Sequence, residues 1–220
     1  MPKRSVVDRA HGLQMAAGRL PKPTPMPEAL RQHLRRDLNP FMDAVEAVED
    51  GESLTPSARK ELLFTVSDAL DGLVSDVTQA VAAGLRDSVD DVEMALLSGD
   101  RARLRDGCET LADVLLWVSE AMAVAHRDEV AAAAASAEEF VRTTTSEALL
   151  EARLPRVGHE LVELGFAVIG DPYPNTLPAF GSIRSIGLMK PDTAAHDTDE
   201  FAAVAAEFRV VCRWLLAVAR

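Results

Sequence analysis

The chain has 220 residues, of which 48% are hydrophobic and only 5% aromatic, so leucine, valine and alanine must fill most of its core. Its formal net charge is −12, and an acidic surface repels nucleic-acid phosphates, which argues against general nucleic-acid binding. The start of the sequence lacks a signal-peptide pattern, and no run of about 18 uncharged apolar residues is present. We therefore expect a cytoplasmic protein without a membrane span. Its many alanine and arginine residues are typical of GC-rich bacterial genomes.

Residues 1–27 are predicted to form a flexible or extended basic arm. Prolines alternate with other residues from Pro21 to Pro27, and such a pattern favours polyproline-II-like backbone. The arm serves as a spacer, or it docks on an acidic partner or on the acidic body of the protein. Basic side chains continue into the start of the next helix, where the candidate docking residues are Arg31, Arg35 and Arg36.

A first amphipathic helix is predicted over about 27–50. Its apolar residues recur every three or four positions from Leu30 to Val48, which keeps them on one face. Pro40 lies inside this pattern, so it either kinks one helix or begins a second helix that Asn39 caps. The uninterrupted apolar stripe favours the kink.

The next helix is predicted to begin at Thr55-Pro56, a capping residue followed by a proline at the first turn. We expect Gly84 to end it. Ser88 and Asp91 have the spacing of a capping box, which would begin a short helix over 89–98. The acidic residues of 90–93 would then complement the positive end of that helix. Gly99-Asp100 marks the following break and cap.

The most regular stripe follows Gly99-Asp100 and has alternating spacings of four and three. Such a sustained seam is typical of a helix that packs against near-parallel neighbours along most of its length. An alanine-rich stretch continues the helical pattern to a break near residue 143, where Thr144 and Glu147 fit a capping box. The residues of the seam are Leu104, Cys108, Leu111, Leu115, Val118, Met122 and Ala125.

A further helix is predicted to begin at Pro155, followed by a long irregular loop over about 171–196 that holds several prolines and glycines. As an alternative, residues 166–169 and 183–189 form the two strands of a small hairpin. The last helix begins near Thr198. We therefore predict an all-α, multi-helix antiparallel bundle with long amphipathic helices.

In this interpretation the bundle spans 28–220, either as one domain or as two sub-bundles, 28–98 and 100–220. Two cysteines, Cys108 and Cys212, fall on apolar faces of the predicted helices, where reduced cysteine behaves as a small hydrophobic residue.

The sequence contains no local catalytic, phosphate-binding or metal-binding motif, so we predict no catalytic residue, metal or cofactor. His159 and Glu163 are one helical turn apart and supply either a surface pair or two polar groups of a site. If the 171–196 loop covers the helix ends, a small-molecule or enzymatic site would also include Tyr173, Phe180, Arg184 and Trp214.

The favoured interpretation is a non-enzymatic protein–protein interaction or scaffold subunit that binds another protein or a second copy of itself. Long regular apolar stripes together with a basic arm on an acidic body motivate this hypothesis. The alternative is a small-molecule-binding or enzymatic bundle.

Overall fold

The structure, a computed structural model, describes residues 24–34, 54–121 and 127–170, together with residues 43, 46 and 47 and part of 201–218. The described part of 201–218 consists of residues 201, 202, 205, 206, 210, 213, 214 and 216–218. The protein is all-α, and no strand occurs among these residues. Within them, no helix combines the length and the apolar character needed to cross a membrane.

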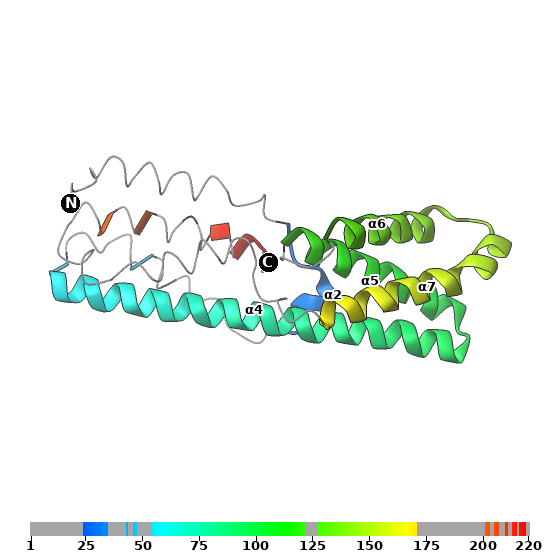
Figure 1. Ribbon diagram of the computed structural model, residues 1–220. Helices are drawn as coiled ribbons and strands as arrows, with labels where there is room; N and C mark the ends of the chain where they lie inside the picture. The colour runs from blue at the N-terminus through cyan, green and yellow to red at the C-terminus, as the bar shows by residue number, and fades with distance from the viewer. Residues whose placement is uncertain are drawn as a thin grey trace. The chain divides into compact units, whose positions relative to one another are not determined.

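The chain divides into two compact units, and each is considered by itself. Unit 1 comprises Met1–Pro25, Arg35–Asp76 and Pro178–Arg220, and unit 2 comprises Met26–Leu34 and Val77–Leu177. The described helices are α2 (Glu28–Arg31), α4 (Pro56–Ser98), α5 (Arg101–Ala121), α6 (Arg127–Thr143) and α7 (Glu147–Ile169) (Figure 1). Helix α4 begins in unit 1 and ends in unit 2.

In unit 1, the start of α4 packs against helical residues near the C-terminus. Leu63, Val66 and Leu73 recur every three to seven residues along α4 and are almost fully buried. The guanidinium of Arg59 lies 5.2 Å from the ring centroid of Phe201, so a charged group covers an apolar one at the edge of this core. Phe201, Ala205 and Val218 are buried.

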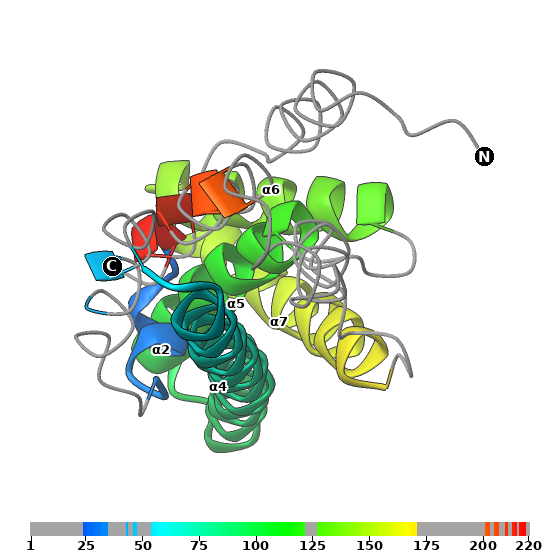
Figure 2. The ribbon, with the colours of Figure 1, turned by 90° about the vertical axis from the view of Figure 1, so that its left-hand side faces the viewer.

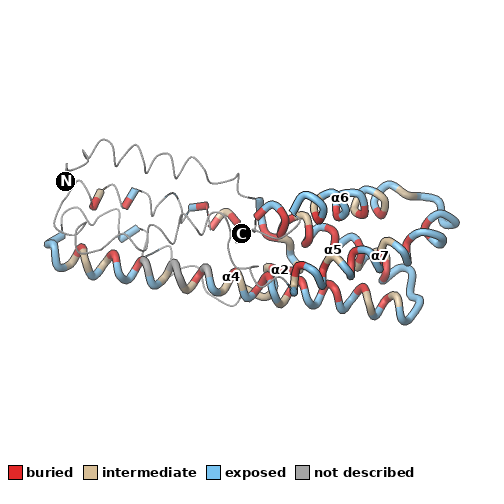
Figure 3. Tube along the Cα trace, viewed as in Figure 1, coloured by how far each residue is buried: buried red, intermediate tan, exposed pale blue. Residues whose placement is uncertain are grey.

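In unit 2, α5 is the central helix. It contacts α2, α6 and α7. It also lies close to α4, because a Cβ at Gly107 would stand 3.2 Å from Val92 Cγ2. Figure 1 shows α4 and α5 joined by a tight turn and α6 and α7 joined by a short connection at the same end, so each pair is antiparallel. Figure 3 shows that the buried residues of these helices form continuous inward faces.

The seam predicted for α5 is confirmed as core. Leu104, Cys108, Leu111, Leu115 and Val118 are each 4% exposed or less. The last two seam residues, 122 and 125, lie outside the described residues. The alanine-rich helix α6 packs mainly on α5 through buried residues that include Ala134 and Ala137, so small side chains there permit close helix contact.

Two predicted helix boundaries are confirmed. Thr55 precedes α4, and its Oγ1 accepts a hydrogen bond from the Ala58 amide at 3.4 Å. Gly99 has a φ of +69°, a conformation that favours glycine, and it ends α4. Asp100 then caps α5, because its carboxylate accepts a hydrogen bond from the Arg103 amide at 3.1 Å.

The expected break at Gly84 is wrong, because α4 continues through it to Ser98. Ser88 does not cap a second helix, since its hydroxyl donates to the Gly84 carbonyl at 2.8 Å within α4. Gly84 instead makes room for α2. A Cβ at this position would lie 2.6 Å from the Ala29 carbonyl oxygen and 2.7 Å from Leu30 Cδ2. Residues 90–93 therefore lie inside α4 rather than at a helix start.

The helix expected over 27–50 is not continuous, although its described residues 43, 46 and 47 are helical as predicted. Helix α2 ends at Arg31, a turn follows at residues 32 and 33, and Leu34 is not helical. The packing of Leu30 beside Gly84 fixes this short segment on unit 2, and such packing overrides a weak local propensity. Pro40 lies outside the described residues.

Three further corrections concern α7. Its capping residue is Ser146 rather than Thr144, because the Ser146 hydroxyl accepts from the Leu149 amide. Pro155 lies inside α7 and does not begin a helix. The helix also includes residues 166–169, which excludes the predicted hairpin, and Val168 in this last turn is buried in the core.

Candidate functional site

The two binding residues predicted on α7 lie on its exposed surface. His159 and Glu163 are exposed on successive turns, and no hydrogen bond or ion pair connects them within the part of the chain that the structure describes. Trp214 is buried and belongs to unit 1. The other candidates from the loop, Tyr173, Phe180 and Arg184, lie outside the described residues.

Of the three predicted docking arginines, Arg31 is described, and Arg35 and Arg36 lie outside the described residues. Arg31 is in α2, where its guanidinium pairs with the Glu28 carboxylate one turn earlier. Among the described contacts, Arg31 is therefore engaged locally.

The largest depression among those described in unit 2 is an acidic groove of about 690 Å³. Helices α2, α4, α5 and α6 contribute its walls, and it contains seven carboxylates and no basic side chain. The residues that line the acidic groove are Pro27, Glu28, Ala29, Gln32, Asp87, Ser88, Asp91, Asp106, Glu109, Thr110, Asp113 and Glu138.

Four of these carboxylates have a partner at the rim of the groove. Glu28 pairs with Arg31. The other pairs are Asp87 with His33 at 3.2 Å, Asp91 with Arg103 at 2.8 Å and Glu138 with Arg142 at 3.4 Å. All four pairs are at least partly exposed, so each contributes little to stability.

The remaining three carboxylates belong to α5. Asp106, Glu109 and Asp113 have no hydrogen-bonding or ion-pair partner among the described residues. Spacings of three and four residues place them on one face of the helix, along about 10 Å of its length. This row of carboxylates, which we call the α5 acidic row, lies opposite the Glu138 carboxylate of α6.

Asp113 shows the electrostatic consequence of this arrangement. Partial burial raises the pKa of the Asp113 carboxyl above its ordinary value, and the negative charges of Glu138 and Glu109 raise it further. Glu138 and Glu109 therefore repel a negative charge on Asp113, and a positive charge in the groove would relieve this repulsion.

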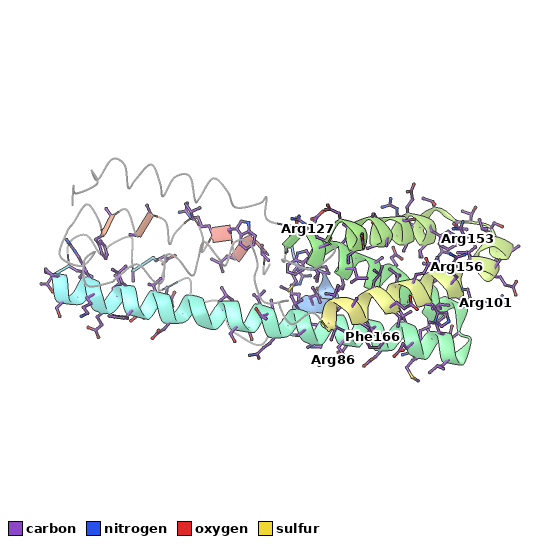
Figure 4. All side chains as sticks on the ribbon, in the orientation of Figure 1. Arg86, Arg101, Arg127, Arg153, Arg156 and Phe166 are labelled. Carbon is purple, nitrogen blue, oxygen red and sulfur yellow. The ribbon has the colours of Figure 1, made fainter. Side chains whose placement is uncertain are left out.

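A second depression, of about 390 Å³, lies between the starts of α5 and α7. Its basic residues are already engaged: Arg101 pairs with Glu151, and Arg105 donates to the Val141 carbonyl at 2.8 Å. Figure 4 shows Arg101, Arg153 and Arg156 gathered at this end of unit 2. Arg153 covers the Phe140 ring at 5.1 Å, and Arg156 pairs with Glu160 at 2.8 Å.

No group of three or more histidine, cysteine, aspartate or glutamate side chains among the described residues is arranged to hold a metal ion. Cys108 is fully buried in the core, and burial raises the pKa of its thiol to about 12, which keeps the thiol protonated.

Reasoning from the sequence missed the acidic groove. The α5 acidic row was visible as a second stripe with spacings of three and four, on the side of the helix away from the apolar seam. The row lines a groove only together with residues such as Glu28, Asp87 and Glu138, which come from three other helices.

Comparisons with known proteins found no match: no family model, no curated protein and no solved structure is similar to this chain.

Proposed function

We propose that the protein is a non-enzymatic interaction protein whose acidic groove binds a cationic segment of a partner protein. The observation that carries this proposal is the α5 acidic row, three carboxylates that have no ion-pair partner among the described residues, on one wall of a groove of about 690 Å³. Charge complementarity of this kind steers association and selects against acidic partners.

The dimensions of the row favour a helical partner segment. Asp106, Glu109 and Asp113 follow the spacing of one helix face, so lysine or arginine side chains repeated every three or four residues on a partner helix can meet them in register. Nucleic acid is excluded from the same groove by like charge.

A cation in the groove would also act on the Asp113 carboxyl. Burial raises the Asp113 pKa most, and the negative charges of Glu138 and Glu109 add to this effect. A cation in the groove would offset the charge part of this effect and favour the ionised carboxylate that binds it.

The proposal is tested with a defined probe, an alanine-based helical peptide with lysines spaced three and four residues apart. Titration of the full chain by calorimetry is expected to give saturable binding that weakens as salt is added. The variant Asp106→Asn/Glu109→Gln/Asp113→Asn is expected to lose this binding. An otherwise identical peptide with glutamate in place of lysine should not bind.

A matched control separates the groove from overall charge. Asp90→Asn/Glu147→Gln/Glu163→Gln also removes three exposed carboxylates, but none of them lines the groove. We expect this control to bind the lysine peptide like the unmodified protein. Equal loss of binding in both triple variants, or no saturable binding at all, would contradict the proposal.

A further inference from the structure

The short segment 26–34 is held on unit 2 by its side chains. Helix α2 has only four residues and no side-chain cap at its start. Nevertheless, Met26 is 2% exposed and Leu30 is fully buried. Gly84 permits the close approach, because any side chain there would meet the Ala29 carbonyl oxygen and Leu30. Figures 1 and 2 both show α2 beside α4 and α5.

This segment is also one wall of the acidic groove. Pro27, Glu28, Ala29 and Gln32 line it from α2 and its ends. If the segment leaves α4, the groove loses this wall and the carboxylate that Glu28 brings to it.

Charges act on the segment in both directions. His33 at its end lies 3.2 Å from Asp87 of α4, which favours docking when the imidazole is protonated. Glu28, by contrast, lines a groove that contains the α5 acidic row, and its pairing with Arg31 of the same segment offsets part of this like-charge repulsion. A cation in the groove would neutralise the part that remains.

We propose that docking of segment 26–34 and occupation of the acidic groove stabilise one another, so that the segment regulates the groove. This inference rests on the proposed function, because it concerns the same site. By thermodynamic reciprocity, a groove ligand must favour the docked segment to the same extent that docking favours the ligand. When the segment is docked in only a fraction of the molecules, the apparent affinity for the ligand is the affinity of the docked form multiplied by that fraction.

Two variants weaken docking without changing a residue that lines the groove. Gly84→Ala places a methyl group against the Ala29 carbonyl oxygen, while alanine itself favours the helix α4. Leu30→Ala removes the buried anchor from the other side. Leu97→Ala, on an α4 residue that is 82% exposed, is the control.

Amide hydrogen exchange measures docking independently of affinity. The amides of Leu30 and Arg31 donate to the Pro27 carbonyl, and that of Gln32 donates to Glu28. Addition of the lysine peptide to the full chain should slow their exchange. In Gly84→Ala and Leu30→Ala, exchange at these amides should be faster without peptide, and the peptide affinity should fall about tenfold or more. Leu97→Ala should change neither quantity.

The outcomes separate the two proposals. If the unmodified protein binds the lysine peptide through the α5 acidic row but Gly84→Ala and Leu30→Ala bind it equally well, the coupling is wrong and the proposed function stands. Unchanged exchange at residues 30–32 on peptide binding would overturn the coupling as well. If the unmodified protein does not bind the peptide, the proposed function fails, and the coupling fails with it.

Discussion

Gly165 of α7 lies directly against Val89 of α4, where a Cβ on the glycine would stand 2.4 Å from the valine Cγ2. Seven residues earlier on the same face, a Cβ at Gly158 would stand 3.1 Å from Leu104 Cδ1 and 3.4 Å from Leu96 Cδ2. The two glycines therefore let α7 approach α4 and α5 more closely than any other residue would allow.

The Gly165 contact predicts a specific loss of stability. Gly165→Ala should lower the free energy of unfolding by about 1–3 kcal/mol, because the methyl group overpacks a contact that is already tight. Denaturant unfolding measures this change. Gly158→Ala should have a smaller effect, since its nearest neighbour is the end of a flexible leucine side chain.

The double variant Gly165→Ala/Val89→Ala is the control for the Gly165 prediction. If the clash with Val89 causes the loss, removing the valine methyl groups should make the double variant more stable than the sum of the two single effects. Strict additivity would mean that the added methyl group acts elsewhere.

The buried seam of α5 predicts a larger effect. Leu115 is fully buried, so Leu115→Ala should lower the free energy of unfolding by about 2–5 kcal/mol through lost burial and the cavity left behind. Urea unfolding followed by circular dichroism measures this loss. A change of a few tenths of a kcal/mol would show that α5 is not the centre of unit 2.

Asp113 makes the stability of the protein depend on pH. Its pKa is raised in the folded state, so between the unfolded and folded pKa values the folded protein binds more protons. Stability from this group is therefore gained as the pH falls through that window and is lost as the pH rises. Asp113→Asn should raise the melting temperature at neutral pH by roughly a degree or two.

The gain from Asp113→Asn should shrink as the pH is lowered into the acidic range, where the native aspartate is protonated. Melting curves at several pH values for both proteins measure this dependence. A gain that is equal at all pH values would show that the amide stabilises the fold for a reason other than charge.

Cys108 should be chemically inert in the folded protein. Its side chain is fully buried and its thiol pKa is about 12, whereas the thiolate is the reactive form. In a Cys212→Ser background, a thiol reagent such as Ellman's reagent should modify Cys108 at pH 8 only as fast as the protein opens. Modification at the rate of a free thiol would contradict the burial of this residue.

Pro155 offers a way to stabilise α7. It lies inside the helix and is exposed, so it withholds an amide hydrogen bond from the carbonyl of residue 151 without filling the core. Pro155→Ala should raise the free energy of unfolding by about 1–3 kcal/mol. Thermal unfolding measures this gain, and a lower melting temperature would indicate that the proline ring stabilises the turn after α6.

Reasoning from the sequence was reliable where the signal was local and strong. The alternating seam from Leu104 to Val118 identified the buried face of α5, because only a helix brings such positions together. Thr55-Pro56 and Gly99-Asp100 marked real helix ends, since their capping and backbone preferences act within one turn.

Only the tertiary structure decided whether α4 continues past Gly84, where α2 ends, and which carboxylates share a groove. Glycine costs a helix about 1 kcal/mol relative to alanine, whereas full burial of one leucine such as Leu30 contributes about 1.5–3 kcal/mol. The packing of α2 therefore outweighs the local signal at Gly84. Likewise, the seven acidic positions were readable one by one, but they line one groove only because four helices bring them to the same place.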